Sequence, residues 1–261
     1  MPDEPDVAAA VARLDELTRR LRRECPWDRE QDERSIVPHT VEEAYELADA
    51  ANGGDDRKLL DELGDVLFQV HFLSLLLEER GAGDLAQVAE HCRRKLIHRH
   101  PHVFGDVEAR SAGEVLRNWD QIKRSEPGRE GGIFGDVPEN LPALLHARKA
   151  QRRAASSGLD VDHVPYDAVE GELEELRAAG AEREAAFREV GDLLFAAVNV
   201  ARKLRVDPEL ALRGATGRFR ERVEAAEGMA ARAGASWESL SAGERLSLYA
   251  RAVLAARRAG E

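Results

Sequence analysis

The sequence predicts an all-α protein made of two tandem helix-bundle modules joined by a Gly/Pro-rich linker. Apolar residues recur at helical spacing along most of the chain, no segment shows a convincing strand alternation, and one pattern of carboxylates and apolar residues occurs twice. We place the first module at residues 1–126, the linker at 127–140 and a second, divergent module at 141–261. Helices with one apolar face bury it against other helices, so each module should be a bundle.

Composition limits the classes of function. The 261 residues include 38 Lys and Arg against 50 Asp and Glu, a formal charge of −12. This balance argues against nucleic-acid binding, which needs a basic surface to displace counterions. Two cysteines are too few for a disulfide framework, no apolar run is long enough for a membrane span, and the first residues are acidic, unlike a signal peptide. We expect a cytoplasmic protein with no membrane or nucleic-acid partner.

The first predicted helix covers residues 7–23 and is amphipathic. We interpret the arginines on its outer face as solvated; they are Arg19, Arg20, Arg22 and Arg23. Pro26 marks its end, because proline disfavours helical conformation in the residue before it. We expect a loop from there to Thr40, which is a candidate N-cap three residues before Glu43.

The next two predicted helices carry a cluster of carboxylates. Each residue of an α-helix advances by about 100°, so Glu42, Glu43 and Glu46 share one face. A turn rich in Asn, Gly and Asp would fold the following helix back, and Glu62 and Asp65 stand side by side on it. A capping role could explain Glu43 but not its two neighbours. We therefore predict two facing rows of carboxylates that form a metal site.

The rest of the first module is also helical. The helix with Glu62 is apolar nearly all round as far as residue 77, which is typical of the middle of a bundle. A helix from about Asp84 carries Lys95 and Arg99 and stops before Pro101, and after a loop the segment 111–125 predicts one more helix, with Trp119 and Lys123. Glycine and proline then crowd residues 127–138, which predicts the linker.

The second half repeats the carboxylate pattern, at an offset of 129 residues for the first row and 127 for the second. The counterparts of Glu43, Glu46, Glu62 and Asp65 are Glu172, Glu175, Glu189 and Asp192, and those of Lys95 and Arg99 are Arg218 and Arg222. Glu42 is replaced by Gly171, and Trp119 and Lys123 fall opposite Ser247 and Arg251. The second copy therefore lacks the fifth carboxylate and one aromatic side chain.

This set of residues suits phosphate chemistry. Carboxylate oxygens are the ligands that Mg²⁺ prefers, and Mg²⁺ is usually shared with substrate phosphates. Lys95 and Arg99, one helical turn apart, could take further phosphate charge. The sequence has no GxxxxGK[ST] phosphate loop, and a di-iron bundle would need ExxH where Glu62 and Glu189 begin ExxD. Hydrolysis of a nucleotide phosphate fits these parts.

Five segments, taken together and in order, closely resemble the MazG family of the all-α NTP pyrophosphatase superfamily. They are Cys25-Pro-Trp-Asp28, Glu42-Glu43-x-x-Glu46, Glu62-x-x-Asp65, His100-Pro-His-Val-Phe104 and Trp119-Asp-Gln-Ile-Lys123. The resemblance implies hydrolysis of nucleoside triphosphates between the α and β phosphates, to monophosphate and pyrophosphate. It also implies Mg²⁺, or Mn²⁺ in its place, a homodimer, and a house-cleaning role against non-standard nucleotides.

The resemblance implies residue roles as well. The metal ligands would be Glu43, Glu46, Glu62 and Asp65, with Glu42 as a neighbouring carboxylate and candidate general base; Lys95, Arg99 and Lys123 would bind phosphates, and Trp27 and Trp119 would lie near the nucleoside. The second module would use Glu172, Glu175, Glu189 and Asp192 with Arg218 and Arg222. Because Gly171 and Ser247 depart from the pattern, we expect the first module to be the more competent. The alternative is a catalytically idle nucleotide sensor or interaction scaffold.

Overall fold

The computed structural model describes residues 6–126, 132–135, 137–180 and 182–259. Every regular element in these ranges is helical, which confirms the all-α prediction. No helix in the described part of the chain combines the length and apolar character that crossing a membrane requires. The chain forms two compact units, Met1–Asp136 with Arg153–Gly158 and Val137–Arg152 with Leu159–Glu261. The predicted linker at 127–140 lies partly outside the described residues.

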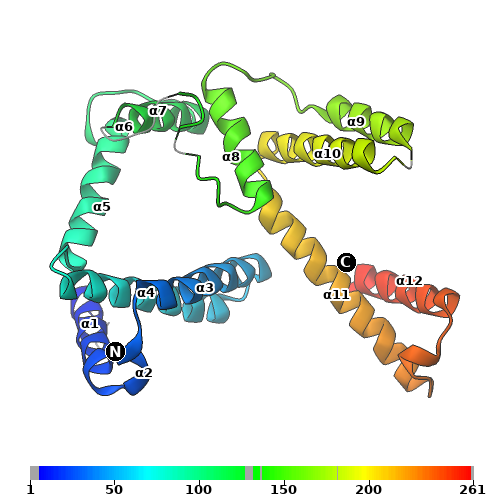
Figure 1. Cartoon of the computed structure of the whole chain (residues 1–261), viewed down its shortest axis with the longest axis horizontal. Coiled ribbons are helices and arrows are strands. Elements are labelled where there is room, and N and C mark those ends of the chain that lie inside the picture. Colours follow the sequence, from blue (N-terminus) through cyan, green and yellow to red (C-terminus); the bar gives the residue numbers. More distant parts are fainter. Residues whose placement is uncertain (1–5, 127–131, 136, 181, 260–261) are drawn as a thin grey trace. The chain divides into compact units, whose positions relative to one another are not determined.

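The first unit is organised around an antiparallel helix pair. Its helices are α1 (Val7–Glu24), α2 (Pro26–Glu30), α3 (Glu33–Gly53), α4 (Asp56–Glu79), α5 (Leu85–Arg99), α6 (Pro101–Phe104) and α7 (Ala112–Ser125). α3 and α4 lie side by side (Figure 1), α1 packs against α4, and α7 packs against α5. Ile36 of α3 meets Phe72 and Leu76 of α4 in the buried core. This packing holds the two carboxylate-bearing helices against each other.

α3 begins earlier than the sequence predicted. Asp32 is its N-cap and accepts hydrogen bonds from two first-turn N–H groups, while the Asp32 N–H donates to Ser35 Oγ at 2.9 Å. The predicted loop as far as Thr40 is therefore wrong, and Thr40 lies inside the helix, where its hydroxyl donates to the Ile36 carbonyl. Pro38 removes one backbone hydrogen-bond donor from the helix, which is unfavourable. The capping box and the burial of Ile36 favour the helix in spite of this loss.

Two arginines of α1 bind the far end of α4. Arg19 pairs with Glu78 at 3.0 and 2.6 Å, and Arg22 pairs with Glu79 at 2.9 and 2.8 Å. The hydrogen bond from Arg22 lowers the pKa of the Glu79 carboxyl. The prediction of a solvated arginine face is therefore wrong for these two residues, because carboxylates 57 and 59 residues away in the chain face them.

The second unit contains a similar helix pair. Its helices are α8 (Ala143–Ser156), α9 (Tyr166–Ala179), α10 (Arg183–Lys203), α11 (Pro208–Arg232), the short 3₁₀ helix η1 (Trp237–Ser239) and α12 (Ala242–Ala259), and the last residues of α8 belong to the first unit. α9 packs along α10, and α12 packs along α11 (Figure 1). Gln151 of α8 donates to the Phe195 carbonyl of α10 at 2.8 Å. The pairing of α9 with α10 brings the second set of predicted carboxylates together.

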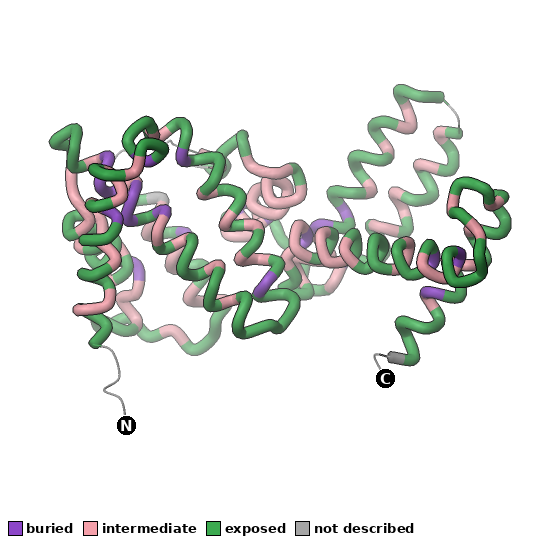
Figure 2. Tube along the Cα trace, turned by 90° about the horizontal axis from the view of Figure 1, so that it is seen from below, coloured by how far each residue is buried: buried purple, intermediate pink, exposed green. Residues whose placement is uncertain are grey.

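Burial is confined to short groups of residues along the helices (Figure 2). In the second unit the buried apolar residues are mostly small, namely Ala196, Val198, Ala226, Ala230 and Ala252. In the first unit, Arg153 at the end of α8 is fully buried, 4.0 Å from the buried Asp120 of α7. Large parts of the helix surfaces are thus left uncovered, including apolar faces of α4 and α10.

Candidate metal centre

The α3–α4 connection sets the register of the helix pair. Gly54 ends α3 in the left-handed conformation at φ 69°, which glycine adopts without the strain other residues meet. Asp55 then caps α4 by accepting from the N–H groups of Arg57 and Lys58 at 3.0 and 3.2 Å. The chain reverses within these two residues, so the side chains of α3 and α4 face each other from the first turns onward.

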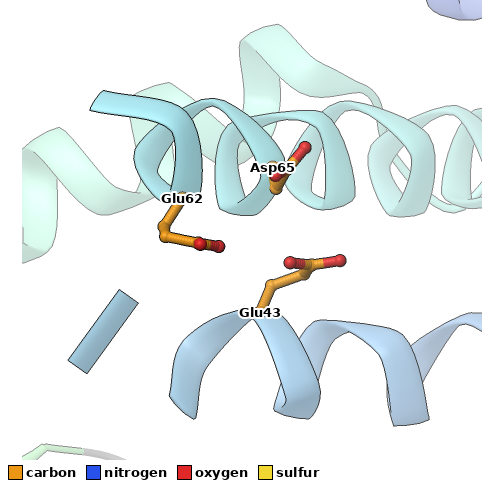
Figure 3. A group of neighbouring side chains, drawn as sticks. All are labelled: Glu43, Glu62 and Asp65. Atoms are coloured by element: carbon orange, nitrogen blue, oxygen red, sulfur yellow. The ribbon is translucent and has the colours of Figure 1, made fainter. Parts of the chain in front are cut away.

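Three carboxylates meet across this helix pair. Glu43 of α3 and Glu62 and Asp65 of α4 each place one carboxylate oxygen within 4.8 Å of the others. Figure 3 shows Glu43 and Glu62 reaching toward each other between the helices, with Asp65 one turn along α4. The i, i+3 spacing puts Glu62 and Asp65 next to each other on α4. The antiparallel pairing of α3 with α4 brings Glu43 to face them. This is the predicted meeting of the two rows, except that Glu46 lies outside the group of three.

The charges in this group repel one another. Burial raises the pKa of the Glu43 carboxyl, and Asp65, Glu46 and Glu62 raise it further. Burial also raises the pKa of Glu62, with Glu46 and Asp65 adding to the effect. Oε2 of Glu62 is enclosed and has no hydrogen-bond partner. A carboxylate oxygen in that position is left without compensation for its lost hydration.

The donor set fits a hard divalent cation. All three groups offer oxygen, the donor that Mg²⁺ and Mn²⁺ prefer, and the enclosed oxygen of Glu62 would gain the partner it lacks. Glu46 is close enough to raise the pKa of Glu43 and Glu62, so it lies near the same position. A divalent cation bound here would attract all three carboxylates and so offset their mutual repulsion, because its charge is larger than that of any one carboxylate.

The second unit holds a matching group. Glu172 of α9 lies with Glu189 and Asp192 of α10, and their carboxylate oxygens are also within 4.8 Å of one another. Burial raises the pKa of Glu172, and Glu175, Asp192 and Glu189 raise it further. The same ExxD spacing on the second helix of each pair produces both groups.

Comparison with known proteins identifies the family. A family model described as the MazG nucleotide pyrophosphohydrolase domain matches residues 31–104, from just before α3 through α6. The nucleoside triphosphate pyrophosphohydrolase of Escherichia coli K12 is 39% identical over 236 residues, covering 86% of this chain and 89% of the relative. The chain belongs to the MazG family. A Thermotoga maritima relative named nucleoside triphosphate pyrophosphohydrolase/pyrophosphatase MazG is 41% identical over 228 residues, covering 86% of this chain and 87% of the relative.

A more distant relative matches less of the chain. The nucleoside triphosphate pyrophosphohydrolase of Mycobacterium tuberculosis is 36% identical over 158 residues, which are 60% of this chain and 47% of the relative. The family-model match covers all three residues of the first carboxylate group, Glu43, Glu62 and Asp65. The site geometry and the family assignment therefore refer to the same helix pair.

The cations expected for a MazG protein lie on other helices than the carboxylates. Arg99, only 6% exposed, turns toward α7, where it donates to both carboxylate oxygens of Glu126 at 2.7 and 2.6 Å and lies 5.3 Å from the ring centre of Trp119. Lys95 is on α5 and Lys123 on α7. α5 leads away from the α3–α4 pair (Figure 1), and in the second unit Arg218 and Arg222 are on α11.

One residue near the MazG carboxylates was missed by sequence reasoning. His39 of α3 places Nδ1 3.6 Å from Oε2 of Glu42, and its ring lies edge-to-face with that of Trp27 at a centroid distance of 5.9 Å. The available signal was its position three residues before Glu42, which puts both on one helix face. This signal was not used because the sequence predicts a loop as far as Thr40, where the structure has the first turns of α3.

Proposed function

We propose that the protein hydrolyses nucleoside triphosphates between the α and β phosphates, releasing nucleoside monophosphate and pyrophosphate. The observation that carries this proposal is the group of Glu43, Glu62 and Asp65, with its uncompensated Glu62 oxygen, in a MazG chain. The names of the E. coli and T. maritima relatives support it. We further propose Mg²⁺ as the cofactor, with Mn²⁺ able to replace it, and a house-cleaning role in the cytoplasm against non-standard nucleotides.

The chain's own residues divide the work of this reaction. A bound divalent cation would neutralise phosphate charge and help to orient the triphosphate. Glu43, Glu62 and Asp65 would hold it, with Glu46 beside them. Glu42 is 68% exposed next to this group and would accept a proton from the water that attacks phosphorus. Such a carboxylate is free to act because it is not needed as a ligand.

Charge on the remaining phosphates needs donors from elsewhere. Lys95 and Lys123 are our candidates in the first unit, and Arg218 and Arg222 in the second. Arg99 is the weaker candidate of its helix, because Glu126 already occupies its guanidinium. Trp119, stacked against Arg99 and 4.9 Å from the His100 ring, has partners of its own in the protein. We propose that Trp27, which is half exposed, lies closer to the nucleoside.

We also propose that the protein is a homodimer. Leu60, Leu63, Leu67 and Val70 are exposed at helical spacing, and they form one apolar face of α4. They turn away from Glu62 and Asp65 by the angular count of a helix. Continuous apolar surface of this kind typically marks a protein interface, and a second copy of α4 would cover it. Sedimentation of the wild type and of Leu63→Lys tests this, with a monomeric wild type as the contrary result.

The second candidate function is a nucleotide sensor or scaffold that binds without turnover. The absence of a fifth carboxylate at Gly171 favours this reading for the second unit. It predicts metal and nucleotide binding with no pyrophosphate release.

A product assay separates the two functions. The full chain is incubated with Mg²⁺ and, in turn, dCTP, dGTP, dUTP and ATP, and both pyrophosphate and orthophosphate are measured. We expect pyrophosphate from the wild type and from Asp61→Asn, whose carboxylate is next to Glu62 but outside the group of three. Glu43→Gln should lose at least about 100-fold in turnover, the size typical of catalytic groups. Orthophosphate alone, or no turnover, would refute the hydrolase.

A further inference from the structure

His39 stands between two functional parts of the first unit. It lies on α3, one turn before Glu42, and its Nδ1 is 3.6 Å from Glu42 Oε2. The same ring meets Trp27 of α2 in an edge-to-face arrangement, with 5.9 Å between centroids and 65° between planes. His39 and Glu42 are both exposed, so this is a surface arrangement that a ligand can reach.

Trp27 has an exposed ring on an anchored backbone. Tryptophan is usually well buried, yet Trp27 as a whole residue is 52% exposed. The backbone beneath it is fixed: Gln31 Nε2 donates to the Trp27 carbonyl at 2.9 Å, and Arg22 donates to the Gln31 carbonyl at 3.0 Å. Nucleobases of any kind stack on such aromatic faces. The exposed indole is therefore available as a platform for a base.

The contacts run in a line from this platform to the carboxylates. Trp27 touches His39, His39 is next to Glu42, and Glu42 is close enough to Glu43 to raise the pKa of its carboxyl. A nucleoside triphosphate has the same order of parts, with an aromatic base at one end and anionic phosphates at the other. His39 lies where the two ends of such a ligand are joined.

We infer that His39 is a positioning residue for the proposed hydrolysis, seating Trp27 for the nucleobase and orienting Glu42 beside the metal-binding carboxylates. The inference rests on the proposed function and assigns a role to a residue outside the carboxylate set. Imidazole suits both tasks, because an aromatic ring can pack edge-to-face with an indole while a ring N–H can be donated to a carboxylate. Phenylalanine can do only the first task, and glutamine only the second.

Two substitutions separate the tasks. His39→Phe keeps a ring against Trp27 and removes the nitrogen next to Glu42, so kcat should fall by about 10-fold or more, as for other residues that orient a functional group, with KM within about twofold. His39→Gln keeps a polar group for Glu42 and removes the ring, so KM should rise by about 3- to 10-fold with a smaller change in kcat. A purely structural role would not give opposite kcat and KM patterns.

A double substitution tests whether His39 acts through Glu42. If it does, adding His39→Phe to Glu42→Gln should lower kcat no further than Glu42→Gln alone. The matched control is His163→Phe, because His163 is exposed and its Nε2 is 3.7 Å from Asp167 Oδ1 in the second unit. This control should match the wild type in kcat and KM. Circular dichroism melts should be unchanged in all variants, because the substituted side chains are exposed.

A binding measurement gives an independent readout. ATP with a methylene bridge between the α and β phosphorus atoms should quench indole fluorescence in the wild type, and Trp27→Phe should lose that quenching. His39→Gln should bind this analogue more weakly and His39→Phe about as well as the wild type.

Three outcomes overturn the inference while leaving the hydrolase intact. They are an active wild type with unaltered His39 variants, equal kcat and KM changes in His39→Phe and His39→Gln, and full additivity with Glu42→Gln. A wild type that neither turns over nor binds nucleotide overturns the proposed function, and the role of His39 falls with it.

Discussion

Removing Glu126 tests whether Arg99 holds the first unit together or binds phosphate. The guanidinium of Arg99 makes two hydrogen bonds to the Glu126 carboxylate, at 2.7 and 2.6 Å, and its side chain is 7% exposed against 18% for Glu126. It also lies over the Trp119 ring. Glu126→Ala would leave this charge enclosed and without its main partner. We expect a loss of stability, since a buried unpaired charge is costly.

The size of the loss follows from this burial. Breaking a buried ion pair by removing one partner costs about 3–5 kcal/mol, and the partial exposure of Glu126 favours the lower end, about 3 kcal/mol. For a unit of this size that corresponds to a fall in Tm of about 10 °C. Arg99→Met with Glu126→Met should recover most of it, because two apolar side chains can replace a buried pair at little cost.

Differential scanning calorimetry and steady-state kinetics together decide the role of Arg99. We expect Arg99→Met with Glu126→Met to melt within a few degrees of the wild type, by the same principle, and to keep the wild-type KM for the triphosphate. A KM raised by about 10-fold or more in this stable double variant would refute the structural role. It would place Arg99 among the phosphate-binding residues that resemblance to the MazG family implied.

Three further predictions concern the carboxylate groups. Mg²⁺ at about 100 times its Kd should stabilise the wild type by about 2.7 kcal/mol in urea denaturation, and Glu43→Gln should lose this gain; an equal gain in the variant would place the metal elsewhere. The raised pKa of Glu43 means that the folded, metal-free protein holds this proton more tightly than the unfolded chain does. The stability that this proton contributes is present below the ordinary Glu pKa of about 4.3 and is lost as pH rises through the raised pKa of Glu43. At pH 7.5, Glu43→Gln should therefore have a higher urea midpoint than the metal-free wild type. This advantage should disappear toward pH 4. A constant difference across this range would contradict the assignment. In the pyrophosphate assay, Glu62→Ala should cost more turnover than Glu189→Ala, because Glu42 has no counterpart at Gly171, and equal losses would remove our preference for the first unit.

Most of the helices could be predicted because their signals are local. The predicted helices at 7–23 and 111–125 agree within one residue at each end with the bounds of α1 and α7. The failure at α3 has a specific cause. Pro38 and Thr40 look like the end of a loop, whereas Asp32 and Ser35 form the capping box that starts the helix earlier. The burial of Ile36 against α4 favours this choice, and that contact lies outside any short window of sequence.

The carboxylates of the candidate site could also be predicted from local sequence signals. Glu62 and Asp65 are neighbours by helical spacing alone, and the Gly54 turn makes it reasonable that Glu43 faces them. The position of Arg99 was not predictable in this way. Its charge and spacing suit a phosphate, but a carboxylate 27 residues later in the chain takes it up first.

The sequence by itself determined which helices carry carboxylates, their spacing of three residues and the second occurrence of that spacing, because one helical turn is a local property. Only the tertiary structure decided which charges are compensated. Arg19, Arg22 and Arg99 find carboxylates from distant segments, whereas Glu43, Glu62 and Asp65 face one another and leave an enclosed oxygen without a partner. Compensation depends on packing between helices, and packing is set by side chains far apart in the chain.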